Sequence, residues 1–91
     1  MDHDKLLQAA KFQVEYYFGQ TNYKNDLHLQ KHADRDGWID LNFVNNFNKM
    51  QSFGLPTCEV FEMLKKSIVV DVQLKSRKNK DSIYQIRKRS L

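Results

Sequence analysis

The chain opens with apolar residues at helical spacing. Between residues 4 and 18 they recur every three or four positions, which places them on one face of an α-helix. They are Leu6, Leu7, Ala10, Val14, Tyr17 and Phe18. Asp2 and Asp4 stand at the start of this run, where a carboxylate can cap a helix and suits its positive end. The pattern predicts a first helix over residues 4–18.

The middle of the chain consists of short apolar runs between polar breaks. Residues 19–22 predict a break in the helix, because Gly, Thr and Asn all have low helix propensity. A short helix is expected over residues 25–32, with Leu29 as its core anchor. The later expectations are a turn at 34–37, a brief strand at 38–39, short helices near 41–44 and 47–53, and a last helix from Pro56 to Leu64.

The hydrophobic period changes from 3.6 to 2 after the last helix. Residues 68–74 are rich in β-branched side chains, and residues 82–87 alternate between apolar and polar. A polar, basic connection over residues 75–81 joins them, so the two runs predict a hairpin. Helices followed by a C-terminal hairpin, with one small strand earlier, are typical of a winged helix. We therefore predict an α+β fold: an elaborated winged helix of five or six helices, with a small antiparallel sheet whose hairpin is the wing.

Composition narrows the class of protein. A chain of 91 residues with 41% hydrophobic residues, three Gly and one Pro is expected to fold as one small domain. It has no apolar run of about 18 residues, and its acidic start is unlike a signal peptide. The single cysteine, Cys58, has no partner for an internal disulfide, as in proteins of reducing compartments. These features predict an intracellular protein.

Charge is divided unevenly along the chain. Residues 1–64 carry six Lys/Arg and nine Asp/Glu, whereas residues 65–91 carry nine and two. A basic segment on a mildly acidic domain is suited to phosphate contact, and it also suits a solvated hairpin. Charge alone leaves both interpretations open, including for the connection from Lys75 to Lys80.

Motifs for metal binding and catalysis are incomplete. Residues 32–43 imitate a calcium loop, but His32 and Phe43 occupy the two end positions where acidic ligands are required. His28 and His32 are four residues apart, yet few other zinc ligands remain. Cys58 has no paired histidine signature. We predict no catalytic residues, no metal and no cofactor, and therefore no enzyme.

Four runs of sequence carry a family resemblance. They are QVEYYFGQTNYKNDLHL at residues 13–29, DGWIDL at 36–41, FNKM at 47–50 and EVFEMLKKS at 59–67. Together they resemble the La motif of La and La-related RNA-binding proteins, over about residues 7–88. The resemblance implies an elaborated winged helix. It also implies that residues 1–91 are one La-motif domain, at the N-terminal side of a longer protein with an RNA-recognition motif downstream.

The resemblance also implies a binding site. In the family, a cleft captures the 3′-terminal uridines of RNA that end in a free 3′ hydroxyl. The matching positions here are Gln13, Tyr16, Tyr17, Asp26, His28 and Phe47. Taken singly, these aromatics are typical of a core and Asp26 of a helix cap. With the resemblance, we expect Phe18 in the core, Tyr16 in the cleft and Tyr17 in both.

The chemistry of these residue types fits RNA. Aromatic faces stack on splayed bases, and single-stranded ends are splayed easily. Asp26 can accept hydrogen bonds from both hydroxyls of a terminal ribose and would repel a 3′ phosphate. Gln13 offers a donor and an acceptor for a uracil edge. The sequence departs from the family pattern at His28, where an aromatic is usual, and at Gln20 and Tyr23.

The resemblance suggests partners and a location. The runs DGWIDL and FNKM are closer to nuclear La and the La-related protein 7 type than to messenger-binding branches, which predicts a nuclear, monomeric protein. Its partners would be uridine-rich RNA 3′ ends of RNA polymerase III transcripts, in ribonucleoproteins, or one dedicated RNA such as telomerase RNA. The alternative is a degenerate winged helix that acts as a protein-interaction module in a larger complex.

Overall fold

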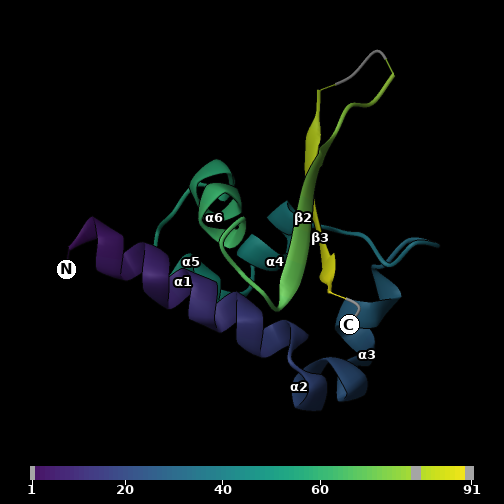
Figure 1. Cartoon of the computed structure of the whole chain (residues 1–91), viewed down its shortest axis with the longest axis horizontal. Helices are drawn as coiled ribbons and strands as arrows, with labels where there is room; N and C mark the ends of the chain where they lie inside the picture. The colour runs from purple at the N-terminus through teal and green to yellow at the C-terminus, as the bar shows by residue number, and fades with distance from the viewer. Residues whose placement is uncertain (1, 79–80, 90–91) are drawn as a thin grey trace.

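Six helices and a three-stranded antiparallel sheet form the part of the chain that the computed structural model describes, residues 2–78 and 81–89 (Figure 1). In chain order the elements are α1 (His3–Phe18), α2 (Gln20–Asn25), α3 (Leu27–Lys31), β1 (Ile39–Asp40), α4 (Leu41–Asn45), α5 (Asn48–Gln51), α6 (Thr57–Leu64), β2 (Val70–Lys75) and β3 (Ile83–Lys88). The predicted α+β winged helix is confirmed in the type and order of its elements.

Helix α1 supplies one wall of the core, as its apolar spacing predicts. Ala10, Val14 and Phe18 are buried along one face, while Leu6 and Tyr17 pack beside them partly exposed. α6 packs against α1 at an angle (Figure 1) and contributes Val60, Phe61 and Leu64 to the core. Among the described residues, no helix combines the length and the apolar character needed to cross a bilayer.

The sheet covers the remaining side of the core. Its strand order is β1-β3-β2, and all pairings are antiparallel. Ile86 of the central strand pairs with Ile39 on one side and with Val72 on the other, and it is completely buried. The β2–β3 hairpin extends beyond the helices (Figure 1), as expected for a wing. Of the predicted basic connection, residues 79 and 80 lie outside the described residues.

The predicted break over residues 19–22 is wrong in extent. Only Gly19 interrupts the helices, with an extended backbone at φ −66° and ψ 156°, and α2 begins at the next residue. Asn22 donates from Nδ2 to the carbonyl oxygen of Tyr17 at 2.9 Å, so it caps the end of α1 from within α2. Tyr23 stacks on the buried Phe18, with ring centroids 5.5 Å apart. Packing and capping therefore outweigh the low helix propensity of this segment.

Other boundaries differ from the prediction as well. The helix expected over residues 25–32 begins at Leu27, because Asn25 ends α2 and Asp26 caps α3, and the strand expected at 38–39 lies at 39–40. The first long strand begins at Val70 rather than residue 68, because the Ser67 hydroxyl accepts a hydrogen bond from the Val69 N–H at 3.0 Å and turns the chain there. The helix expected over residues 47–53 is shorter. Phe47 is its N-cap residue, with ψ at 146°, and Phe53 follows its end.

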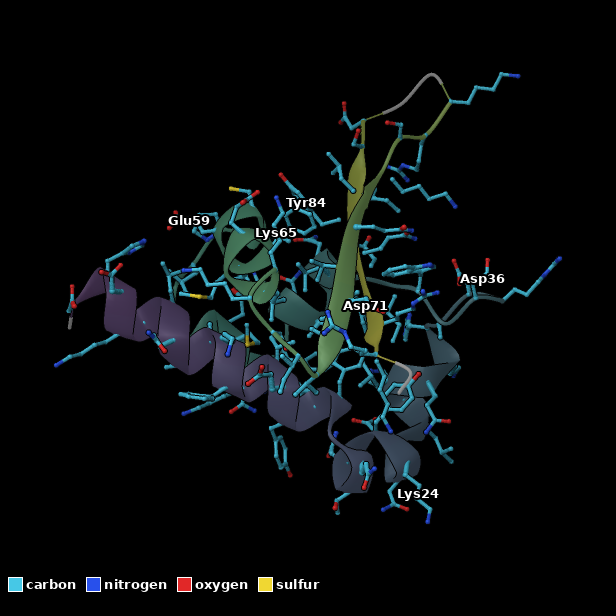
Figure 2. The ribbon with its side chains drawn as sticks, viewed as in Figure 1. Lys24, Asp36, Glu59, Lys65, Asp71 and Tyr84 are labelled. Carbon is cyan, nitrogen blue, oxygen red and sulfur yellow. The ribbon has the colours of Figure 1, made fainter. Side chains whose placement is uncertain are left out.

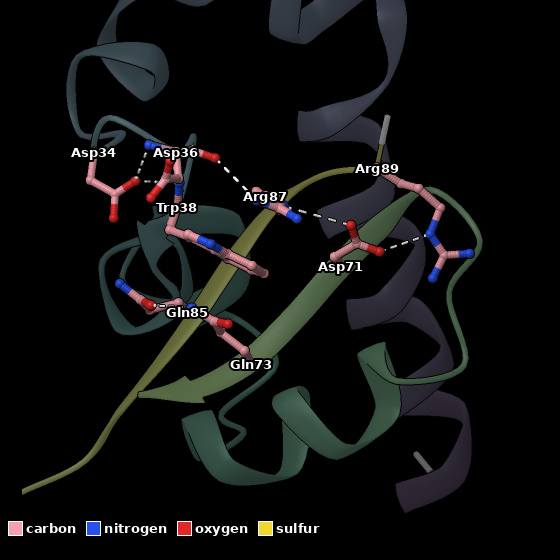
Figure 3. A network of polar contacts seen from close by, with 8 residues as sticks. All are labelled: Asp34, Asp36, Trp38, Asp71, Gln73, Gln85, Arg87 and Arg89. Carbon is pink, nitrogen blue, oxygen red and sulfur yellow. Dashed lines mark hydrogen bonds and ion pairs between the residues drawn. The ribbon is translucent and has the colours of Figure 1, made fainter. Parts of the chain in front are cut away.

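A polar network ties the loop before β1 to the sheet (Figure 3). One carboxylate oxygen of Asp34 accepts from the N–H groups of Asp36 and Trp38, both at 2.9 Å, which forms the predicted turn. The guanidinium of Arg87 lies 4.2 Å from the centre of the Trp38 ring. Its Nε is 3.6 Å from the Asp71 carboxylate on β2. The network therefore connects three segments that lie far apart in the sequence.

Replacing Gly54 with alanine is expected to lower the free energy of unfolding by about 1 kcal/mol, because L-residues rarely adopt positive φ. Gly54 has φ +67°, and a Cβ built there meets nothing within 4 Å. The loss of stability would therefore come from backbone strain alone and not from a steric clash. Thermal unfolding should show it as a fall in Tm of about 4–8 °C. An unchanged Tm would contradict the left-handed backbone at this position.

Candidate nucleic-acid interface

One of the two tyrosines at the end of α1, Tyr17, meets a phenylalanine from the middle of the chain. The Tyr17 and Phe47 rings pack edge to face, with centroids 5.0 Å apart and planes at 85°. Tyr16 lies beside Tyr17 at 6.2 Å and is 63% exposed. Tyr17 is thus partly in the core and partly at the surface, as predicted, while Tyr16 presents its ring to solvent.

The aromatic surface continues from Phe47 toward α3. Phe43 lies edge to face with Phe47 at 5.2 Å, and His28 is 6.4 Å from Phe47 and 5.5 Å from Phe43. His32 stacks on Phe43 at 3.8 Å, with planes 27° apart. We call this set the aromatic cluster: Tyr16, Tyr17, His28, His32, Phe43 and Phe47. The prediction did not include Phe43 and His32; the four-residue spacing of the two histidines was the available signal.

Asp26 lies between α2 and α3 in a hollow next to Tyr16. We call this hollow the Asp26 pocket; its lining residues are Tyr16, Thr21, Asn22, Asn25, Asp26 and Leu27. The Oδ1 atom of Asp26 accepts from the Leu29 N–H at 2.9 Å and so caps α3. Its Oδ2 atom has one long contact, with Asn22 Nδ2 at 3.4 Å. One oxygen therefore holds the helix, and the other keeps lone pairs for a ligand.

Asn22 is a positioning residue that sequence reasoning did not assign to the site. Its amide donates to the Tyr17 carbonyl and approaches Asp26. It thus fixes the carboxylate relative to the last turn of α1, where the two tyrosines lie. Asn22 belongs to the run at residues 13–29 that carries the family resemblance. Its positioning role could not be predicted, because it depends on how the chain turns at Gly19.

The Tyr17 hydroxyl connects Gln13 to this arrangement. Burial raises the pKa of Tyr17 above its ordinary value of 10.0, and a hydrogen bond with the Gln13 side chain opposes that shift. The charges of Asp26 and Tyr16 nearby also raise the pKa. Tyr17 therefore stays neutral at physiological pH and keeps a hydroxyl proton to donate.

The structure gathers all six predicted positions around one region. Gln13 and Asp26 lie near enough to Tyr17 to shift its pKa. The rings of Tyr16 and Phe47 pack against Tyr17, and the His28 ring lies next to Phe47. His28 is exposed, so it lies at the rim of the aromatic cluster. Of the other two departures, Tyr23 packs on Phe18, and Gln20 lines another groove on α2. Over residues 2–78 and 81–89, no three His, Cys, Asp or Glu residues are placed to hold a metal ion together.

Comparison with known proteins adds independent evidence. Residues 10–66 match the family model described as the La domain. An uncharacterized HTH La-type RNA-binding protein of Schizosaccharomyces pombe is 36% identical over 62 residues, 68% of this chain and 13% of its own length. La-related protein 7 of Xenopus tropicalis is 32% identical over 76 residues, 81% of this chain and 13% of its own. La-related protein Larp4B of Drosophila melanogaster is 33% identical over 69 residues, 76% of this chain and 4% of its own.

A solved structure supports the fold. The La autoantigen N-terminal domain superposes with a TM-score of 0.74 at 23% identity, covering 93% of this chain and 87% of that chain. The chain spans about an eighth of the length of the first two relatives above. La-related protein 7 and Larp4B match at nearly equal identity, so identity by itself does not select a branch.

Proposed function

The chain belongs to the La domain family, and from this membership we propose that it binds the 3′ end of single-stranded RNA in the Asp26 pocket and the aromatic cluster beside it. The main observation behind this proposal is the position of the Asp26 carboxylate next to an exposed tyrosine ring. One of its oxygens has only a long contact with Asn22 and can accept further hydrogen bonds. Relatives whose names describe RNA-binding proteins support the choice of ligand.

The aromatic cluster is suited to unstacked bases. Tyr16 and His28 offer exposed rings, while Tyr17 and Phe47 are held in place by their mutual packing. Stacking of a base on an aromatic side chain is worth about 1–3 kcal/mol. Two such contacts are enough to hold the last nucleotides of a single strand against the protein.

Asp26 would read the terminal ribose. A carboxylate accepts hydrogen bonds only, so it pairs with the 2′ and 3′ hydroxyls, which both donate. A 3′ phosphate would place negative charge against this carboxylate. A strand without a 2′ hydroxyl would lose one of the two hydrogen bonds. The pocket would thus prefer RNA over DNA and a free 3′ end over a blocked one.

Gln13 would favour uridine. Its amide has both a donor and an acceptor, and it lies near enough to the Tyr17 hydroxyl to affect the pKa of Tyr17. A uracil edge also presents both kinds of group. The uridine preference rests on this match and on the family resemblance.

We extend the proposal to biological partners on the motif resemblance. The RNA would be the uridine-rich 3′ end of RNA polymerase III transcripts, bound for protection, chaperoning or ribonucleoprotein assembly in the nucleus. A protein dedicated to one RNA, such as telomerase RNA, is the more specific form of this proposal. In a longer protein, an RNA-recognition motif downstream would raise the affinity for this RNA.

Competition between two oligouridylates tests the proposal. A short oligomer with a free 3′ hydroxyl is expected to bind at least about tenfold more tightly than the same oligomer with a 3′ phosphate, because hydrogen bonds to a charged group contribute about 1.5–3 kcal/mol. Fluorescence anisotropy with a 5′-labelled oligomer measures both. Equal affinities would contradict the proposal and favour the alternative, a protein-interaction module.

A further inference from the structure

A second groove lies on α2, next to the Asp26 pocket. Its lining residues are Gln20, Thr21, Lys24, Asn25 and Lys88, and we call it the Lys24 groove. Four of them belong to α2, and Lys88 is the last residue of β3. Figure 2 shows Lys24 on the outer side of α2, away from the core. The groove therefore forms where the end of the wing returns to the second helix.

The chemistry of the Lys24 groove is that of an anion site. Its side chains supply two ammonium groups, two amides and a hydroxyl, and among the described residues its lining contains no carboxylate. The Lys88 ammonium lies 6.0 Å from the centre of the Tyr23 ring, which is itself stacked on the buried Phe18. A cation over an aromatic face is restrained in position. The position of the Lys88 ammonium is thus restrained by the Tyr23 ring, whereas the Lys24 side chain extends into solvent.

The groove is continuous with the Asp26 pocket. Thr21 and Asn25 line both hollows. The Asn25 side chain donates to the Thr21 carbonyl at 3.0 Å, which holds the shared wall in shape. A strand whose last ribose lies at Asp26 can therefore pass over α2 and bring earlier phosphates to the two lysines.

We propose that the Lys24 groove binds the phosphate backbone of the RNA nucleotides that precede the 3′ end captured in the Asp26 pocket. This inference rests on the proposed function and adds a path for the rest of the strand. The contact would be independent of sequence, because phosphates carry no base identity. It would give the domain affinity for longer RNA without altering its choice of the last nucleotides.

Length-dependent binding tests this path. Oligouridylates of three and of eight nucleotides, both with a free 3′ hydroxyl, are titrated against the wild-type chain and against Lys24→Gln, Lys88→Gln and Lys88→Arg. Each lysine-to-glutamine change should weaken the eight-nucleotide oligomer about fivefold near 0.1 M salt and make the slope of log affinity against log salt shallower by about 0.7, the value for one phosphate contact of a single strand. The three-nucleotide oligomer should be unaffected, and Lys88→Arg should retain affinity.

Lys5→Gln and Lys66→Gln are the matched controls. Both make the same change in charge on exposed residues. Lys5 lies about 20 Å along α1 from Phe18, at 1.5 Å per residue. Thermal unfolding of each variant separates loss of binding from loss of fold, and Lys24→Gln is the cleaner test because its side chain is exposed.

Two outcomes would overturn the inference in distinguishable ways. If the short oligomer binds with its hydroxyl preference but Lys24→Gln behaves like Lys5→Gln on the long one, the groove does not carry the strand and the proposed function stands. If the short oligomer shows no preference for the hydroxyl end, the proposed function fails, and the path from the Asp26 pocket fails with it.

Discussion

Asp26→Asn is expected to lower the affinity for a three-nucleotide oligouridylate with a free 3′ hydroxyl by at least about tenfold, since hydrogen bonds to a charged group contribute about 1.5–3 kcal/mol. Asparagine can keep the bond from Oδ1 to the Leu29 N–H, because Asn and Asp cap helices equally well. Its second group is an NH₂ that donates, so it cannot accept from ribose hydroxyls. The preference over a 3′-phosphate end should shrink as well.

Asp40→Asn is the control for this prediction. Asp40 caps α4 as Asp26 caps α3, accepting from the Asn42 N–H at 2.8 Å, and it is exposed. The same substitution there should leave RNA affinity unchanged. Binding is measured by anisotropy and folding by circular dichroism. If Asp26→Asn and Asp40→Asn bind equally well, the carboxylate does not contact the ribose.

Phe18→Ala is expected to lower the free energy of unfolding by about 3–5 kcal/mol, the range for removing a large buried aromatic side chain. Phe18 is fully buried at the end of α1, and Tyr23 stacks on it from α2. The substitution would open a cavity beneath α2. Since a domain has about 5–15 kcal/mol of stability in total, the loss should appear as a large fall in the denaturant midpoint.

Phe12→Ala on the same helix provides the comparison. Phe12 is 63% exposed, and surface substitutions usually change stability by less than about 0.5 kcal/mol. Both variants remove the same atoms from α1, so helix propensity changes equally. A similar loss in the two variants would contradict the assignment of Phe18 to the core.

The sequence determines most of the fold because apolar spacing reports burial directly. The helix over residues 4–18, the core position of Leu29 and the hairpin follow from periods of 3.6 and 2. Helix α2 could not be predicted in this way. Three of its six residues, Thr21, Asn22 and Asn25, have low propensity, and it depends on the packing of Tyr23 on Phe18 and on the hydrogen bond from Asn22 to Tyr17. Both contacts require α1 to be in place already.

The site was predicted through the family resemblance rather than through pattern. Nothing in the spacing of Tyr17 and Phe47, thirty residues apart, indicates that their rings meet. The stacking of His32 on Phe43 also follows from the approach of α3 to α4. The Lys24 groove combines α2 with the end of β3, so its two lysines are 64 residues apart in sequence.

The double use of the Asp26 carboxylate has an evolutionary consequence. Because one oxygen caps α3, selection for folding alone would retain a capping residue here, such as Asp, Asn or Ser, even in a descendant that no longer bound a ligand. Tyr16 is different, since its exposed ring caps no helix and fills no part of the core. A relative that has lost the aromatic residue at position 16 but kept Asp26 would therefore be one in which the domain still folds but no longer binds RNA in this pocket.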